Sequence, residues 1–172
     1  MHFLLKILLA FLLLFNVVGC GYKPSAKFSR QITGETISTS VIISGENPEN
    51  TVLVKDAVDT AILEIFHASL TDKNIADTHL YISLSDPSYT AVEYNENGYV
   101  IAYRVVVHLH IKRVTGKDVK HYTTSGSYDL EISPNSVITD QQRFVAIKNS
   151  ASKAIQSFLA KISAEKNTKD KN

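Results

Sequence analysis

What the sequence lacks excludes several classes of protein. Its 172 residues include one cysteine and no tryptophan. A single cysteine cannot form the intrachain disulfides that hold small secreted scaffolds together. Strong charge of one sign is also absent, because 18 lysines and arginines face 17 acidic residues. This balance gives no indication of a nucleic-acid partner. The sequence also has no acidic tail of the kind that would indicate a cationic partner.

Motifs for catalysis are equally scarce. The sequence contains no glycine-rich phosphate loop and no G-x-S-x-G nucleophile motif, the two patterns that most often mark nucleotide-binding and hydrolytic enzymes. We therefore expect a protein that works through a partner, not an enzyme, and nothing indicates a cofactor.

The lone cysteine, Cys20, stands at the end of the only long apolar run. Residues 3–18 are almost wholly apolar, interrupted only by Lys6 and Asn16. A short cationic start, an apolar region and then small residues are typical of a secretory signal. A cysteine directly after Val17-Val18-Gly19 resembles a lipobox, in which the thiol is acylated and cleavage leaves the cysteine as the first residue.

An ordinary signal peptide or a membrane anchor is the alternative interpretation. Against an anchor, the run is slightly short for a span of ~20 residues, and no cationic cluster follows it. Removal of residues 1–19 takes away Lys6 and no acid, which leaves 17 bases and 17 acids. Under the sorting rule of such lipoproteins, Gly21 in place of aspartate implies the outer membrane.

The chain divides into four predicted segments. We expect a signal peptide over residues 1–19, an acylated tether over 20–35, a single α+β domain over 36–164 and a polar tail over 165–172. A tether of about fifteen residues extends at most ~3.3–3.6 Å per residue, so the domain would work close to its membrane.

Hydrophobic periodicity predicts strands, bounded by turn residues, and two long helices. The expected order is β-α-β-β-β-α, a two-layer α+β sandwich with a mixed four-stranded sheet and both helices on one face. A right-handed crossover should make the first two strands parallel, and the place of strand one stays open. The expected strands are 36–44, 78–94 with an interruption at Pro87, 99–113 and 119–132, and the helices are 50–70 and 139–164.

The turn at residues 115–118 predicts the register of the last two strands. If Thr115 opposes Asp118, then Arg104 faces Asp129, an opposite-charge pair. The same register places Gly126 opposite Val107. That glycine either allows a helix to approach closely or marks a bulge.

Both helices show an apolar stripe at helical spacing, typical of a face packed on a sheet. The second helix also has a predicted start, because Thr139 with Gln142 three residues later resembles a capping box. The stripes are Val54, Ala57, Val58, Ala61, Ile62, Ile65 and Phe66 in the first helix, and Phe144, Ile147, Ala151, Ala154, Ile155, Phe158, Leu159 and Ile162 in the second.

Three histidines are the best candidates for metal ligands. His108 and His110 share the polar face of one strand, with His121 diagonal to His110 on the next. Diagonal neighbours lie ~7–8 Å apart, and no carboxylate stands among them to orient the ligands. We interpret them as solvated strand residues and expect no metal.

Cations and tyrosines form the remaining candidate sites. Arg104, Lys112 and Arg113, with Lys117 and Lys120, surround the last hairpin and could meet anionic lipid phosphates; an ordinary solvated surface is the alternative. Four tyrosines are expected on or around the preceding hairpin, and tyrosine is favoured at interfaces. They are Tyr81, Tyr89, Tyr94 and Tyr99.

Together these features resemble the LptE family of lipopolysaccharide-assembly lipoproteins. The resemblance rests on Cys20-Gly21-Tyr22, the order of elements, the Asn97-Gly98 turn followed by Ala102-Tyr103, and a last helix that opens near Asp140-Gln141-Gln142. It implies a non-enzymatic plug inside the LptD β-barrel translocon. Such a plug assists barrel assembly, binds lipopolysaccharide on its way to the cell surface, and is anchored on the periplasmic face of the outer membrane.

One departure from the family pattern affects the predicted site. Family members are thought to bind lipopolysaccharide through basic side chains beside the hairpin and before the last helix, where this chain has Glu96, Ile138 and Thr139. The predicted lipopolysaccharide contacts are therefore Arg104, Lys112 and Arg113, and the predicted barrel contacts are the four tyrosines. The alternative is another outer-membrane lipoprotein module, such as an activator of a cell-wall synthase.

Overall fold

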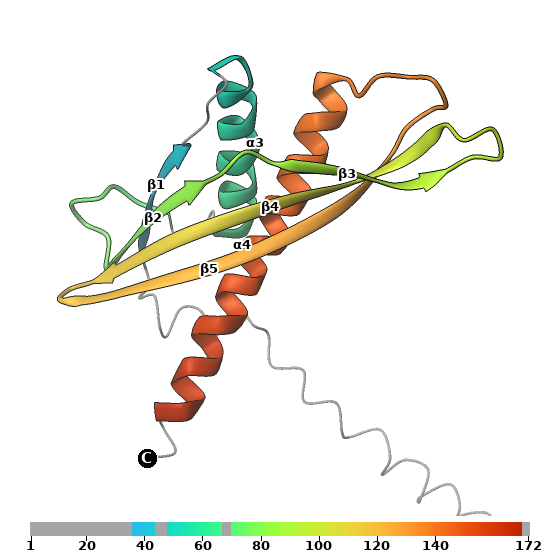
Figure 1. Cartoon of the computed structure of the whole chain (residues 1–172). Helices are drawn as coiled ribbons and strands as arrows, with labels where there is room; N and C mark the ends of the chain where they lie inside the picture. Colours follow the sequence, from blue (N-terminus) through green and yellow to red (C-terminus); the bar gives the residue numbers. More distant parts are fainter. Residues whose placement is uncertain (1–35, 44–47, 67–69, 170–172) are drawn as a thin grey trace, which may run out of the picture.

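Two helices and a five-stranded sheet make up the part of the chain that the structure describes (Figure 1). A computed structural model describes residues 36–43, 48–66 and 70–169. The order β-α-β-β-β-β-α confirms the predicted α+β class. The elements are β1 (Ile37–Ile43), α3 (Pro48–Phe66), β2 (Thr78–Leu84), β3 (Ser88–Tyr94), β4 (Val100–Thr115), β5 (Asp118–Glu131) and α4 (Asp140–Lys169).

The sheet is organised around β4, which is 16 residues long. Along one edge β4 pairs with β5, and along the other it pairs first with β3 and then with β2, all antiparallel. Residues 85–87 separate β2 from β3, so the predicted interrupted strand is two strands laid end to end, and the count is five instead of four. Pro87 lies in this gap, where its missing N–H removes no ladder hydrogen bond.

The first strand lies at an edge of the sheet. β1 runs parallel to β2, with Ile37 opposite Thr78 and Ile43 opposite Leu84. The parallel direction confirms the prediction, and the pairing supplies the position that periodicity left open.

The predicted register of β4 and β5 is confirmed residue by residue. Thr115 opposes Asp118, and Arg104 opposes Asp129. The Arg104 Nε and Nη2 atoms donate to the two Asp129 carboxylate oxygens at 2.7 and 2.8 Å. Alternation then sends the odd residues of β4 to one face of the sheet and the even residues to the other.

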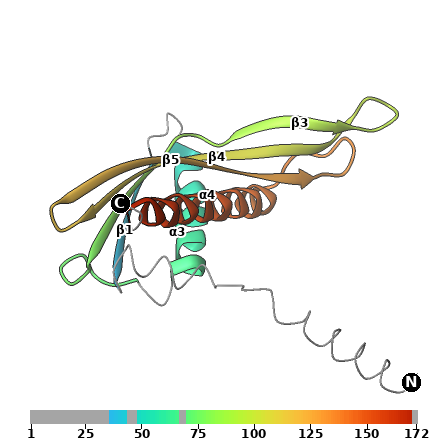
Figure 2. The same cartoon turned by 90° about the horizontal axis from the view of Figure 1, so that it is seen from below.

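Both helices cover the same face of the sheet, as Figure 2 shows. They are joined by Lys148 Nζ of α4, which donates to Glu64 Oε1 of α3 at 2.8 Å. Phe158 is fully buried and meets the Tyr122 ring edge-on at 5.1 Å between centroids. Most residues of the predicted stripes belong to the buried core: Ala57, Val58, Ala61 and Ile62 of α3, and Ile147, Ala151, Ala154, Ile155, Phe158 and Ile162 of α4. Ile65, Phe144 and Leu159 are partly buried and pack against it.

Gly126 is the point at which α4 comes closest to the sheet. A Cβ atom on this residue would lie 2.1 Å from the Ser150 carbonyl oxygen and 2.6 Å from the Ala154 amide nitrogen. The pairing of β4 with β5 continues unbroken past Val107 and Gly126. The glycine therefore serves the close approach of the helix and does not mark a bulge.

The helix ends differ from the predictions in two places. Leu70 lies outside α3, which ends at Phe66, and instead forms a parallel bridge with Ile37. α4 continues to Lys169, beyond the predicted end at Ala164. Its capping box is present: the Thr139 amide donates to Gln142 Oε1 at 3.0 Å, and the Gln142 amide donates to Thr139 Oγ1 at 3.3 Å.

The outer edge of β5 is covered by lysines of α4. Lys153 Nζ donates to the Ser127 carbonyl oxygen at 2.7 Å, and Lys161 Nζ donates to that of Thr123 at 2.6 Å. Charged side chains along an edge strand discourage pairing with another chain.

The membrane-related predictions fall largely outside the described residues. Cys20, the signal peptide and the tether all lie there. Within the ranges that the structure describes, none of the helices has the length and apolar character needed to cross a bilayer.

Candidate functional site

The helix-free side of the sheet, called here the open face, carries the polar side chains of β4 and β5. On β4 these are the even residues from Arg104 to Lys112, and on β5 the odd residues from His121 to Asp129. Apart from Val106, they are charged residues, histidines, serines and threonine. Such a face can stay wet or meet a polar partner.

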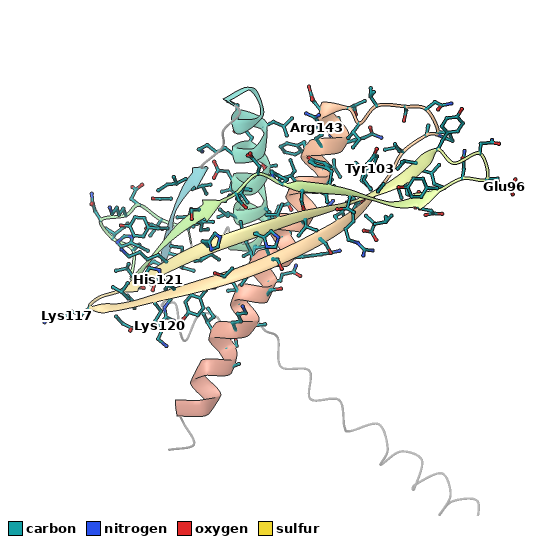
Figure 3. All side chains as sticks on the ribbon, in the orientation of Figure 1. Glu96, Tyr103, Lys117, Lys120, His121 and Arg143 are labelled. Carbon is teal, nitrogen blue, oxygen red and sulfur yellow. The ribbon has the colours of Figure 1, made fainter. Side chains whose placement is uncertain are left out.

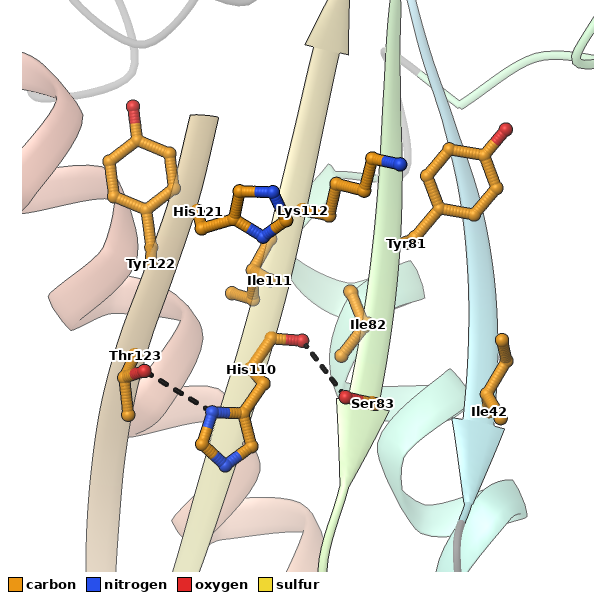
Figure 4. A pocket seen from close by; sticks show the side chains of 10 residues that line it. All are labelled: Ile42, Tyr81, Ile82, Ser83, His110, Ile111, Lys112, His121, Tyr122 and Thr123. Carbon is orange, nitrogen blue, oxygen red and sulfur yellow. Dashed lines mark hydrogen bonds between the residues drawn. The ribbon is translucent and has the colours of Figure 1, made fainter. Parts of the chain in front are cut away.

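A hollow of about 320 Å³ lies on the open face where β1, β2, β4 and β5 run side by side (Figure 4). Three of its ten lining residues (Ile82, Ile111 and Tyr122) belong to the buried core. The other seven offer side chains to a ligand: Ile42 of β1, Tyr81 and Ser83 of β2, His110 and Lys112 of β4, and His121 and Thr123 of β5. Most are polar, with tyrosine and isoleucine as the apolar part.

Two cations lie near the Tyr81 ring. Lys112 Nζ is 5.9 Å from the centre of that ring, and Lys73 Nζ, from the loop before β2, is 5.5 Å from it. Both are within the range of cation–π attraction. In Figure 4 the Lys112 side chain reaches across β2 toward Tyr81. No ion pair involves either lysine within the described part of the chain, so both ammonium groups remain uncompensated.

The histidines lie as the register predicts. His110 Nδ1 is hydrogen-bonded to Thr123 Oγ1 at 3.2 Å, and His121 is opposite Lys112. His108 is exposed on the same face but does not line the hollow. Among the described residues there is no group of three or more His, Cys, Asp or Glu side chains that could hold a metal ion.

The structure does not bring together the three cations predicted to meet lipopolysaccharide. Arg104 and Lys112 share the open face but are eight positions apart, roughly 26 Å at the rise of a strand. Arg104 is already bound to Asp129; their hydrogen bonds raise the pKa of Arg104 and lower the pKa of Asp129.

Arg113 faces the helices and is only 5% exposed. Its Nη2 donates to Asp118 Oδ2 at 2.8 Å, and its guanidinium carbon is 5.9 Å from the centre of the Tyr122 ring. The expectation of an exposed Arg113 is therefore wrong. Strand alternation explains the result, since Arg113 directly follows the outward-facing Lys112 and must point to the other side.

The four tyrosines occupy three different environments. Tyr94 and Tyr99, 58% and 46% exposed, lie at the β3–β4 hairpin, whereas Tyr81 lines the hollow. Tyr89 packs against the core, and burial raises the pKa of its phenol. The expectation that they gather in one place is wrong, because β2 and β3 pair with opposite ends of β4.

The β3–β4 hairpin projects past the helices (Figure 1). It carries exposed apolar side chains. Its turn is held by the Asn95 side chain, which accepts from the amides of Asn97 and Tyr99 at 3.0 and 2.9 Å. Gly98 supplies the positive φ of 80° that the turn requires. We define the hairpin patch as Val92, Tyr94 and Tyr99, the exposed apolar side chains of this hairpin.

The hollow and the hairpin patch lie toward opposite ends of the molecule. In Figure 3, Glu96 marks the tip of the β3–β4 hairpin, and Lys117 marks the tip of the β4–β5 hairpin, close to His121. The sequence could place His110, Lys112 and His121 together through the register of one hairpin. It could not place Lys73, Tyr81 and Ile42 beside them, because those residues arrive on other segments.

Comparison with known proteins gives a family match over most of the domain. Residues 38–162 match the family described as LptE, lipopolysaccharide-assembly. No curated protein matches the sequence.

Solved structures of similar fold come from several bacteria. The rare lipoprotein B from Shewanella oneidensis is 17% identical, with a TM-score of 0.40, and the match covers 77% of this chain and 98% of that one. A minor lipoprotein from Acinetobacter baumannii is 12% identical, with a TM-score of 0.43, and the match covers 77% of this chain and 92% of that one. Lipoprotein B from Nitrosomonas europaea is also 12% identical, with a TM-score of 0.42, and the match covers 77% of this chain and 84% of that one. At these identities and scores the structural likeness carries no functional conclusion.

Proposed function

The chain belongs to the LptE family of lipopolysaccharide-assembly lipoproteins, and we propose that it acts at the outer membrane as the lipid-anchored partner of an LptD-type β-barrel. The observation that carries the proposal is the family match, which spans 38–162 and so nearly all of the described domain. The family consists of assembly lipoproteins and not of enzymes, in agreement with the expectation drawn from the missing catalytic motifs.

The anchor is proposed from the sequence around Cys20. Acylation at this residue would attach the domain on the periplasmic face of the outer membrane, and more than one acyl chain would make the attachment stable. We expect the intact mass of membrane-extracted protein to show a chain that begins at Cys20 and carries lipid. A Cys20→Ala variant should leave the membrane fraction, whereas an unmodified cysteine in the extracted protein would contradict the anchor.

The open face and the hairpin patch support the role of a plug. The lumen of a transmembrane β-barrel is polar, and the serines, threonine, histidines and the Arg104–Asp129 pair of the open face suit such surroundings. Tyrosines are enriched where proteins meet. Tyr94 and Tyr99 of the hairpin patch are therefore the proposed contacts with the barrel wall, together with Tyr81 on the open face, while Tyr89 is held against the core.

Contact with lipopolysaccharide is the second part of the proposal. Of the three cations expected to make it, Lys112 is exposed and unpaired within the described residues, Arg104 is exposed but paired, and Arg113 is buried. Lys112 is therefore the strongest candidate of the three.

Recovery of the barrel from outer membranes tests the partnership. Affinity capture of the full-length protein should bring an LptD-type barrel with it, and a Tyr94→Ser/Tyr99→Ser double variant should recover less. Val119→Ser is a matched control, because Val119 is a similarly exposed apolar residue at the opposite tip. The proposal fails if the unaltered protein recovers no barrel; capture of a cell-wall synthase instead would support the alternative function.

A further inference from the structure

We propose that Asn97, at the tip of the β3–β4 hairpin, is a site of spontaneous deamidation, and that the Asn95 side chain sets the rate of this reaction. Deamidation converts the neutral Asn97 carboxamide into a carboxylate. Such a modification site is independent of the proposed barrel partnership, because the reaction needs no partner and consumes only water.

The residue after Asn97 is the first reason for this assignment. Asn97 is followed directly by Gly98, and no other asparagine of the sequence precedes a glycine. Deamidation begins when the backbone nitrogen of the following residue attacks the asparagine side chain. Glycine has no Cβ atom to obstruct that attack, and its backbone can rotate toward the side chain at little cost. The sequence therefore favours Asn97 over every other asparagine of the chain.

The structure leaves the reacting groups of Asn97 and Gly98 accessible. Both residues are exposed, next to Glu96 at the tip of the hairpin (Figure 3). Within the described part of the chain, the Asn97 carboxamide takes part in no hydrogen bond. A Cβ atom placed on Gly98 would meet nothing within 4 Å apart from its chain neighbours, so the space around the attacking nitrogen is open.

The hydrogen bonds of the turn restrain the attacking nitrogen. The Gly98 amide donates to the Asn95 carbonyl oxygen at 2.9 Å, and this bond must break before the nitrogen can attack. The Asn95 side chain keeps the turn closed, because its Oδ1 accepts from the amides of Asn97 and Tyr99 at 3.0 and 2.9 Å. Attack on a segment that opens and closes rapidly tracks the population of its open form. Asn95 therefore controls deamidation by controlling how often the turn opens.

The bonds and protons of the reaction balance with water as the only co-reactant. The Gly98 nitrogen bonds to Asn97 Cγ, its proton passes through solvent to the departing amide nitrogen, and ammonia leaves. The product is a cyclic succinimide. Water then opens the ring at one of its two carbonyl carbons. One opening gives aspartate with the original backbone, and the other gives isoaspartate, in which the main chain runs through the side chain.

Either product would alter the hairpin patch. The new carboxylate would stand beside Glu96, and two like charges at such a short distance repel each other. Isoaspartate would also lengthen the main chain between Asn95 and Tyr99, which displaces the two amides that Asn95 Oδ1 now binds. The turn between Tyr94 and Tyr99 would loosen, whereas the distant hollow would stay as it is.

Ageing of the full-length protein in a non-ionic detergent at mildly alkaline pH tests the site. Peptide mapping by mass spectrometry measures deamidation at each asparagine, and enzymatic methylation detects isoaspartate. We expect Asn97 to react faster than Asn135 and Asn149, which precede serines and serve as internal controls. Reaction at either of these that equals or exceeds that at Asn97, or an unmodified Asn97 after either has reacted, would overturn the proposal.

Variants of Asn95 test the control of the rate. Asn95→Ala removes the acceptor of two turn hydrogen bonds and should speed up deamidation of Asn97 about tenfold, the scale of those bonds. Asn95→Asp keeps an acceptor oxygen at a turn position that suits aspartate, and should react at the rate of the unaltered protein. An unchanged rate in Asn95→Ala, or equal acceleration in both variants, would refute control by Asn95. Barrel capture enters neither measurement, so failure here would leave the barrel partnership standing.

Discussion

Replacing Gly126 by alanine tests how closely α4 lies on the sheet. The added Cβ would sit 2.1 Å from the Ser150 carbonyl oxygen and 2.6 Å from the Ala154 amide nitrogen. Both are backbone atoms, so the contact can be relieved only by moving the helix away from β5. Overpacking in a core costs roughly 1–3 kcal/mol, and the upper end applies because no side chain can rotate aside.

The sign of the effect makes this substitution informative. Alanine in an unobstructed strand is more favourable than glycine by roughly 0.5–1 kcal/mol, because it loses less conformational freedom on folding. A surface position would therefore be stabilised, whereas Gly126→Ala should lower the free energy of unfolding by about 2–3 kcal/mol. Moving α4 would also strain the bond from Ser150 Oγ to the Val105 carbonyl oxygen, now 3.0 Å.

Urea unfolding followed by circular dichroism provides the measurement. Two-state analysis gives the midpoint and the slope, and a shifted midpoint at unchanged slope would show a change in stability alone. Ser125→Ala, next to Gly126 but on the open face, is the matched control and should stay within about 0.5 kcal/mol. A Gly126→Ala protein as stable as the unaltered one would refute the close approach of the helix.

Three further predictions concern other parts of the fold. Phe158→Ala should cost about 3–5 kcal/mol as a large-to-small change in the core, whereas Lys117→Ala should stay within about 0.5 kcal/mol; similar urea midpoints would contradict the proposed inner face of α4. Thr139→Ala should cost about 1 kcal/mol because it removes the N-cap of α4, and thermal unfolding checks this. Because Arg104 lowers the pKa of Asp129, the stability from this pair should be present above the unfolded pKa of about 3.9 and lost as the pH falls through the folded pKa. Asp129→Asn should therefore flatten the dependence of urea midpoints on pH below about 4, and an unchanged acid slope would argue against the pair.

The two candidate surfaces lie toward opposite ends of the sheet. The hairpin patch offers exposed apolar side chains at one end, and the hollow offers cations and polar groups toward the other. The lysines of α4 cover the outer edge of β5 between them. Tyr81 lines the hollow and is also a proposed barrel contact, so the two surfaces are not independent of each other.

Local patterns in the sequence determined much of the fold. The turn at residues 115–118 and the alternation of the flanking strands were enough to predict every pair from Thr115–Asp118 to Arg104–Asp129. The capping box at Thr139 and the stripe of α4 needed only neighbours within a few turns of helix. Such features succeed because their energetics depend on residues close in the chain or on one hairpin.

Features that depend on distant segments were decided only by the tertiary structure. The end of α3 was overestimated because Leu70 pairs with Ile37, a residue of a different element. The sequence predicts an exposed cation at Arg113. In the structure its side chain points inward, pairs with Asp118 and is covered by the helices. The place of β1 followed from its pairing with β2, which hydrophobic periodicity does not encode.

For the candidate site as well, some features could be predicted from the sequence and others depended on the tertiary structure. Cys20 and its flanking residues predict an anchor and a compartment. Together with the order of elements, the Asn97-Gly98 turn followed by Ala102-Tyr103 and the start of the last helix, they resemble the family. The hollow, by contrast, exists because four strands bring Ile42, Tyr81, Lys112 and His121 side by side. A charge becomes available to a ligand only when no opposite charge packs against it, and that depends on neighbours distant in the chain.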